Sequence, residues 1–256
     1  MENAIIFRFY KEPEICLNRL QLLRKQNPKI KIFGLYWWEQ GQSNIYKKML
    51  GKFLDDFYVS PYKDSYRKRE NWDLVLTDWY KERGKKLKRK SVYILQRDML
   101  VFAPLQDIFN DYKSGQFYIS WIKVLDKNIE KRRSRTSKNG RKQNYEKFKE
   151  LIMRNYGYKK RLLCSLFIFA ILPRKFFEQY TKLVDNTTWF LEYKLPSYAK
   201  IFWLDFYKKD IWVRRFQPKW KCPQNARVEE ISKEYILNEL DKKKWWRMFH
   251  PYFKIR

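Results

Sequence analysis

Short apolar runs alternate with longer segments of helical spacing along the first hundred residues of the chain. Residues 4–10, 30–37, 73–77 and 91–95 are brief runs rich in branched and aromatic side chains, which is typical of strands. These runs therefore predict four strands in the first part of the chain.

The segments between these runs space their apolar side chains as helices do. Leucines follow that spacing in residues 17–26, and the pair Asn27-Pro28 then ends the predicted helix. Residues 44–58 place their apolar side chains on one helical face, and residues 79–87 could form a short, very basic helix. The alternation of strand and helix predicts βαβ units and a mostly parallel sheet.

A binding site is expected where these strands end. Right-handed crossovers bring the carboxyl ends of parallel strands to one edge of the sheet, and ligands bind outside that edge. The residues at the predicted ends are Phe9, Tyr10, Trp37, Trp38, Asp78, Gln96, Arg97 and Asp98.

The second half of the chain contains a strongly basic segment. Residues 131–142 hold seven basic residues in twelve, with no acidic and no apolar side chain, which predicts a loop. It could be a lid that contacts anions or a solvated insertion. Residues 145–156 and 175–183 are expected to be helical, and residues 162–172 form an apolar run for a buried strand or helix.

The charge of the chain is extreme. Lysine and arginine total 57 against 28 acidic residues, which gives a net charge of +29, and aromatic residues make up 19%. Such a field attracts nucleic acid, anionic membranes or phosphate-bearing small molecules, and a generally lysine-rich surface would produce it too. Charge alone does not choose among these.

The cysteines and the N-terminus favour a cytoplasmic location, including the inner face of a membrane. Cys16, Cys164 and Cys222 are far apart, which argues against a zinc site and for a reducing compartment. The first fourteen residues lack the pattern of a signal peptide, and the apolar run 162–172 is too short to span a bilayer.

Gln96 and Asp98 carry the first candidate chemistry. Along a strand they share one face and Arg97 takes the other. A carboxylate at a strand end can help to hold Mg²⁺, which combines one or two protein carboxylates with a substrate diphosphate. The alternative is a surface aspartate that merely ends a strand.

The stretch VYILQRDMLVFAPL, residues 92–105, resembles the segment of GT-A glycosyltransferases that carries their Asp-X-Asp motif. Gln96 stands in place of the first acid, and Asp98 matches the second. The resemblance implies an α/β, Rossmann-like GT-A fold, with a mixed, mostly parallel sheet flanked by helices. It also implies that Asp98 contacts a metal, Mn²⁺ or Mg²⁺, or the ribose of a nucleotide sugar.

His250, the only histidine, supports the same resemblance. It lies in MFHPYF near the end of the chain, and many GT-A enzymes have a late histidine in such a context as a further metal ligand. Imidazole suits such a metal only alongside oxygen ligands. An ordinary histidine beside a proline turn is the alternative.

The acceptor half of these enzymes resembles the segment from PRKFFEQY to FLEYKLPSYAKI. The resemblance puts Glu192 in the place of a base that would take a proton from the acceptor hydroxyl, with Asp185 as second choice. An ion pair of Glu192 with a surface lysine or arginine is an equal alternative.

The resemblance also implies nucleotide contacts from the first strand. Phe7, Phe9 and Tyr10 could stack on a base and Arg8 could meet phosphate, although alternation along a strand keeps them from all facing one pocket. Asp78 is a further candidate contact, or else the N-cap of the following helix.

We therefore expect a metal-assisted glycosyltransferase that uses a nucleotide-diphosphate sugar and an acceptor that could be anionic or lipid-linked. No repeat or Gly/Ser-rich linker divides residues 1–256, so one domain is expected, with a donor half, 1–105, and an acceptor half, 106–256. The alternative is an inactive transferase fold that binds nucleic acid or an anionic membrane. Specific nucleic-acid binding is not expected, because no recognised motif is present.

Overall fold

The computed structural model describes residues 3–62, 71–132, 141–183, 190–209, 213–214, 224–225, 230–242 and 247–255. Its centre is a six-stranded sheet in the order β3-β2-β1-β4-β9-β6. The first four of these strands run parallel, and β9 is antiparallel to both of its neighbours. The strands are β1 (Asn3–Phe9), β2 (Lys31–Tyr36), β3 (Asp56–Val59), β4 (Ser91–Gln96), β6 (Tyr118–Ile119) and β9 (Ala170–Pro173).

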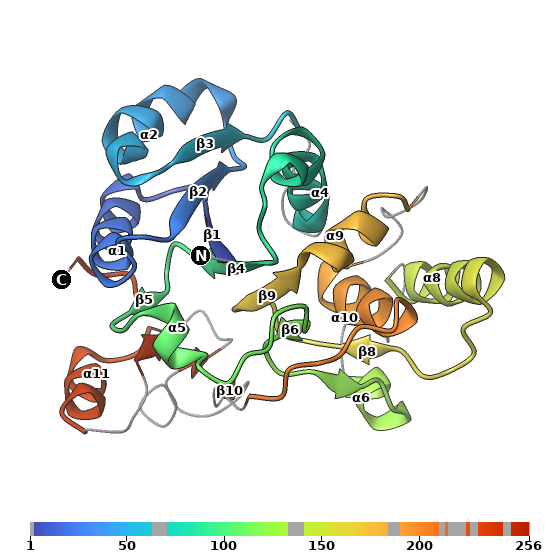
Figure 1. The fold of residues 1–256 in the computed structure, drawn as a ribbon. Coiled ribbons are helices and arrows are strands. Elements are labelled where there is room, and N and C mark those ends of the chain that lie inside the picture. The colour runs from blue at the N-terminus through green and yellow to red at the C-terminus, as the bar shows by residue number, and fades with distance from the viewer. Residues whose placement is uncertain are drawn as a thin grey trace.

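Helices cover both faces of this sheet (Figure 1). The α-helices are α1 (Pro13–Gln26), α2 (Ser43–Leu50), α4 (Trp72–Glu82), α5 (Leu105–Ile108), α6 (Lys127–Arg132), α8 (Arg141–Tyr156), α9 (Arg174–Tyr180), α10 (Leu191–Ile201) and α11 (Lys233–Leu240). Three short 3₁₀ turns are η1 (Gln40–Gln42), η2 (Gly51–Phe53) and η3 (Gly84–Lys86). The predicted α/β class, a mixed and mostly parallel sheet flanked by helices, is confirmed.

Alternation along the strands divides the core into two layers. Ala4 and Ile6 of β1 pack on the side of α4, α9 and α10, whereas Ile5, Phe7 and Phe9 pack on the side of α1 and α2. Both layers are almost fully buried, so the face that a residue of β1 occupies is fixed.

Short ladders extend the fold beyond the sheet. β5 (Leu100–Val101) pairs with β12 (Met248–Phe249), and this ladder brings the C-terminal segment back beside the end of β4. The other ladders join β7 (Lys123–Val124) to β8 (Leu163–Cys164) and β10 (Val213–Arg214) to β11 (Gln224–Asn225).

The third predicted strand, residues 73–77, is wrong. It forms the middle of helix α4, whose residues Trp72, Val75, Leu76 and Trp79 are buried at helical spacing. A five-residue window shows an apolar run, and only the longer window shows its period. The actual third strand, β3, overlaps the end of the helix predicted over residues 44–58, since α2 ends at Leu50.

The other predicted elements were found with shifted ends. The predicted helix 145–156 lies in α8, the one at 175–183 corresponds to α9, and the apolar run 162–172 supplies β8 and part of β9. The basic segment 131–142, predicted as a loop, begins in α6 and ends in α8, and its residues 133–140 lie outside the described residues.

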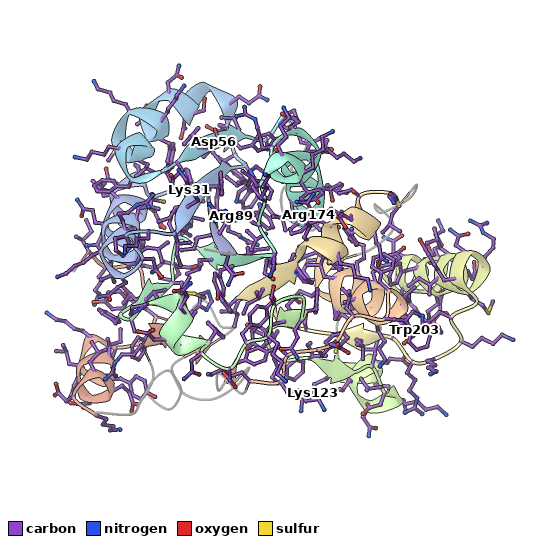
Figure 2. The ribbon with its side chains drawn as sticks, viewed as in Figure 1. Lys31, Asp56, Arg89, Lys123, Arg174 and Trp203 are labelled. Atoms are coloured by element: carbon purple, nitrogen blue, oxygen red, sulfur yellow. The ribbon has the colours of Figure 1, made fainter. Side chains whose placement is uncertain are left out.

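The labelled charged side chains lie in separate parts of the molecule. Lys31 lies on β2, Lys123 on β7, and Arg174 begins α9 (Figure 2). Basic charge is therefore spread across the fold. Within the described ranges, no helix is both long enough and apolar enough to cross a membrane.

Candidate functional site

Two adjoining cavities open at the carboxyl ends of the parallel strands. They share Tyr10, Gln96, Arg97 and Asp98. The larger, of about 310 Å³, is also lined by Lys11, Leu166, Phe167, Ile168, Glu192, His250, Pro251 and Phe253. The smaller, of about 170 Å³, is also lined by Arg8 and Trp37.

The carboxyl end of β1 presents alternate side chains to this site. Arg8 and Tyr10 line the smaller cavity, while Phe7 and Phe9 point to the opposite face of the sheet and do not reach it. The Phe9 ring packs 5.6 Å from that of Tyr46 on α2. The aromatic wall of the site is instead Tyr10, whose ring centroid lies 4.6 Å from that of Trp37.

Gln96 closes the floor of the site and is already engaged. Its Nε2 donates hydrogen bonds to the carbonyl oxygens of Phe167 and Ile168, the second at 3.2 Å. Gln96 therefore fastens the segment before β9 to the end of β4. An ionised carboxylate at this position has no hydrogen to donate and would be repelled by these two carbonyl oxygens.

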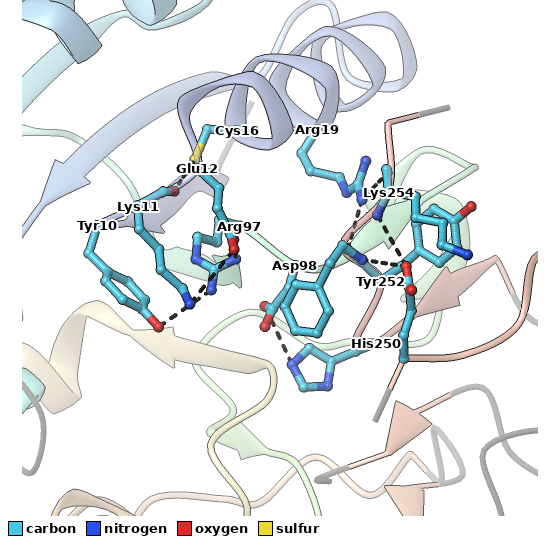
Figure 3. A network of polar contacts seen from close by, with 12 residues as sticks. Tyr10, Lys11, Glu12, Cys16, Arg19, Arg97, Asp98, His250, Tyr252 and Lys254 are labelled. Carbon is cyan, nitrogen blue, oxygen red and sulfur yellow. Dashed lines mark hydrogen bonds and ion pairs between the residues drawn. The ribbon is translucent and has the colours of Figure 1, made fainter. Parts of the chain in front are cut away.

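Asp98 faces His250 across the larger cavity (Figure 3). The imidazole Nε2 lies 3.5 Å from Oδ1 of Asp98, and both side chains are largely buried. Burial alone would raise the pKa of the Asp98 carboxyl. The facing imidazole and the guanidinium of Arg97 outweigh it and hold the pKa well below its ordinary value, so Asp98 is ionised.

The segment that carries His250 is anchored from α1. The buried Arg19 donates from Nη2 to the carbonyl oxygens of Tyr252 and Lys254, at 2.8 and 3.0 Å (Figure 3). The amide of Tyr252 donates in turn to the carbonyl of Asp98 at 2.9 Å. His250 is thus held by these contacts after it and by the β5–β12 ladder before it. Sequence reasoning missed Arg19, because nothing distinguishes it from the other basic residues.

Arg97 lies in the site, although strand alternation predicted that it would point away. β4 ends at Gln96, so the alternation does not extend to Arg97. Its Nη1 pairs with Glu12, and its guanidinium lies 4.8 Å from the Tyr10 ring. Burial would lower the pKa of Arg97, but the Tyr10 hydroxyl and the nearby carboxylates raise it above its ordinary value.

Arg8 is held between two aromatic rings. Its guanidinium carbon lies 4.6 Å from the Trp72 ring and 5.2 Å from the Phe167 ring. Burial lowers the pKa of Arg8 to about 10, against the opposing charge of Asp98, so Arg8 remains a cation at neutral pH.

Glu192 reaches the larger cavity from the first turn of α10. Its Oε1 accepts a hydrogen bond from the amide of Phe167 at 3.0 Å, and its carbonyl accepts from the amide and the hydroxyl of Ser165, each at 2.9 Å. The structure thus brings the predicted base into the same cavity as Asp98 and His250. Asp185, the second choice, lies outside the described residues.

Asp78 is not at a strand end, because it lies within helix α4. Its charge acts on the hydroxyl of Tyr58, and neither of the two cavities is lined by it. The nucleotide contact predicted for Asp78 rested on the strand that the structure replaces with α4.

A buried ion pair lies behind the site, between α4 and α10. The ammonium of Lys194 lies 2.7 Å from Oδ2 of Asp73 and 2.8 Å from the side-chain oxygen of Asn71. The Tyr180 hydroxyl donates to the same Asp73 oxygen. Lys194 and Asp73 are almost completely buried, so this network ties the helix that carries Glu192 to the helix that carries Trp72.

Among the described residues, Asp98 and His250 could supply only some of the ligands that a divalent metal needs. No group of three or more His, Cys, Asp or Glu comes together within the described part of the chain. Asp98 and His250 supply one carboxylate and one imidazole, and Oδ1 of Asp98 makes no hydrogen bond. Mg²⁺ and Mn²⁺ commonly fill their remaining positions with water and substrate phosphates, so the pair fits such a metal when a diphosphate is present.

A groove of similar volume, about 320 Å³, lies along α8. It is lined by charges of both signs, including Glu146, Glu150, Lys159 and Lys160, and shares no residue with the cavities around Asp98. The strand ends, the buried carboxylate and His250 all belong to the other site, which is therefore the functional candidate.

Comparison with known proteins gives remote likenesses of fold. No family model matches the sequence, and no curated protein matches it. The chain is similar to mouse xyloside xylosyltransferase 1, with 11% identity, a TM-score of 0.44 and coverage of 100% of this chain and 99% of that one.

Two further solved structures resemble the chain. A cytidylyltransferase from Leptospira borgpetersenii has 11% identity and a TM-score of 0.45 over 82% of this chain and 77% of that one. The bifunctional glycosyltransferase WbbM has 8% identity and a TM-score of 0.43 over 99% of this chain and 46% of that one. At these identities and scores, the residues of the pocket, and not the likenesses, must support a function.

Proposed function

We propose that the chain transfers a sugar from a nucleoside-diphosphate donor to an acceptor hydroxyl in the cavity lined by Asp98, His250 and Glu192. The observation that carries this proposal is the 3.5 Å approach of His250 to the ionised Asp98 at the carboxyl end of a parallel strand. Such strand ends are where α/β folds bind ligands.

The donor would lie between aromatic and cationic side chains. Tyr10, which lines the larger cavity, offers a ring face on which a base can stack, as aromatic side chains do in nucleic-acid-binding proteins. Arg97 and Lys11 line the site beside Asp98 and would face the negative charge of the diphosphate. The large positive charge of the chain would raise the local concentration of such a donor.

Asp98 and His250 would hold Mn²⁺ or Mg²⁺ together with the donor's phosphate oxygens. Such a metal, when bound, neutralises the charge that develops on the leaving diphosphate. Arg97, fixed by Glu12 and by the Tyr10 ring, keeps a second positive charge beside the same position.

Glu192 would act on the acceptor. A carboxylate at this position can take the proton of the acceptor hydroxyl while its oxygen attacks the anomeric carbon and the nucleoside diphosphate leaves. The hydrogen bond from the Phe167 amide fixes the orientation of the Glu192 carboxylate.

Thermal unfolding with uridine, guanosine and cytidine diphosphate sugars, each with and without Mn²⁺, tests the proposal. A ligand that binds only the folded state stabilises it by about 2.7 kcal/mol at a hundredfold excess over Kd. We expect one donor to raise the midpoint in the presence of Mn²⁺, and Asp98→Ala to abolish the rise. The matched variant Asp107→Ala, on the exposed side of α5, should keep it.

Failure of every donor, with or without metal, would overturn the proposal in favour of an inactive fold. The net charge of +29 supports polyanion binding as that second function. The basic side chains are spread over the fold, so binding of DNA or anionic vesicles would be expected to weaken steeply with salt.

A further inference from the structure

The smaller of the two adjoining cavities, beside Asp98, carries chemistry that the larger one lacks. It measures about 170 Å³ and is the part of the site that Arg8 and Trp37 line. Pockets that enclose whole small molecules usually measure about 300–1,000 Å³. This compartment therefore has room for one substituent of a ligand and not for a complete nucleotide.

Its walls carry buried hydrogen-bond donors without acceptors. Among the described residues, Nη1 of Arg8 and Nε1 of Trp37 are buried and have no hydrogen-bond partner. The indole nitrogen of Trp72, whose ring packs against Arg8, is also buried and has no hydrogen-bond partner. Buried N–H groups without acceptors are costly and rare, so the donors of Arg8 and Trp37 are available to an acceptor group that enters this compartment.

The charge of Arg8 is also not matched by a dedicated carboxylate. In the described part of the chain, no carboxylate lies within ion-pair distance of Arg8. Asp98, the acid whose charge acts most strongly on it, is shared with His250 and Arg97, and Glu12 pairs with Arg97. The compartment therefore presents the Arg8 cation without a carboxylate paired to it alone, and the ionised Asp98 also lines its wall.

The guanidinium is held ready to bind an anion. Trp72 and Phe167 stack on it at 4.6 and 5.2 Å and limit its movement. A planar guanidinium in a fixed position matches the two oxygens of a carboxylate or phosphate better than a flexible ammonium does.

We propose that Arg8, Trp37 and the adjoining Tyr10 form a subsite for a single oxyanion, a carboxylate or a phosphate monoester, borne by one of the two reactants. The identity of the bearer rests on the proposed function, whereas binding of the oxyanion itself does not. A transferase with this subsite would select a reactant that carries an acidic substituent, such as a uronate or a sugar phosphate.

The first experiment measures binding of small oxyanions to the full chain without any nucleotide. The probes are inorganic phosphate, glucose 1-phosphate and glucuronate, with glucose as the neutral counterpart of glucuronate and with ionic strength matched by chloride. We expect the anions to raise the thermal midpoint and glucose to leave it unchanged. A response to glucuronate above that to phosphate assigns the anion to a sugar carboxylate, and the reverse assigns it to a phosphate.

Arg8→Gln, Trp37→Phe and the control Arg154→Gln locate the effect. Arg154 is exposed on α8, and its replacement removes the same charge far from the compartment. Arg8→Gln should weaken anion binding about tenfold or more, since it removes a charge-assisted hydrogen bond. Trp37→Phe keeps an aromatic ring and removes the indole N–H donor without removing a charge, so a smaller loss is expected, and this variant tests the subsite even if Arg8→Gln folds poorly.

Equal anion responses in the wild type, Arg8→Gln and Trp37→Phe would overturn the subsite, as would no response in the wild type. A donor shift that survives together with that result would leave the proposed transferase function standing. An Arg8-dependent anion response in a chain that binds no nucleotide sugar would keep the subsite and remove the proposed function.

Discussion

His250 places its imidazole 3.5 Å from the carboxylate of Asp98, although Asp98 follows β4 and His250 lies far from it in sequence, near the C-terminus. The approach depends on the ladder between β5 and β12 and on Arg19, which holds the carbonyls that follow His250. This pair is the centre of the proposed metal and diphosphate site.

Replacement of His250 by Ala should raise the metal concentration that donor binding requires. Loss of a contact that only orients a metal ligand commonly costs about 10–100-fold in metal affinity, and loss of a ligand should cost at least as much. We expect the Mn²⁺ concentration needed for half of the donor-induced thermal shift to rise at least tenfold. The exposed Asp107→Ala chain serves as the control, and an unchanged Mn²⁺ requirement would remove His250 from the metal site.

Glu192→Gln should separate chemistry from binding. Glutamine keeps an oxygen to accept from the Phe167 amide but cannot take a proton, and positioned bases contribute about 10²–10⁴-fold to rate. Donor binding should be preserved while the rate of sugar transfer to an acceptor falls by that factor. Equal losses in donor binding and in rate would assign Glu192 a structural role instead.

The buried pair of Lys194 and Asp73 should respond differently to single and double replacement. Lys194→Met leaves the carboxylate of Asp73 buried without its cation, and such a loss typically costs about 3–5 kcal/mol. The double variant Lys194→Met with Asp73→Leu removes both charges and should recover much of that loss. Urea unfolding of the two single variants and the double variant gives the coupling energy, and purely additive effects would contradict the pairing.

Asp55 should make the stability of the first βαβ unit depend on pH. Partial burial raises the pKa of its carboxyl, but hydrogen bonds from Lys31 and Arg24 at 2.7 and 2.8 Å outweigh this and lower it. A carboxyl whose pKa is lower in the folded state stabilises the fold above its unfolded pKa of about 3.9 and loses that contribution as pH falls through its folded pKa.

Urea unfolding from neutral to acidic pH should therefore show a difference between the wild type and Asp55→Asn that is largest near neutrality and shrinks in acid. Asp107→Asn, at an exposed position on α5, is the matched control for removal of one carboxylate. A difference that stays constant over the whole pH range would show that Asp55 contributes through packing and not through its charge.

Local patterns were enough for elements whose period is clear within a few residues. The strands at β1, β2 and β4 and the helix at α1 were found where they were predicted, because buried strands and amphipathic helices have distinct periods. Residues 73–77 show where this reasoning stops, since a fully buried helix and a buried strand look alike in a short apolar run.

The sequence by itself determined the α/β class. It also predicted the edge of the sheet at which a site would lie and, through the resemblance, the residues Asp98, Glu192 and His250 as candidates for it. Tertiary structure decided which of the other candidates reach that edge: Arg8 does, while Phe7, Phe9 and Asp78 do not. It also decided that Arg19 anchors the His250 segment and that Lys194 lies buried against Asp73. The physical reason is that these contacts join residues far apart in sequence, and one basic side chain among 57 carries no local mark of its partner.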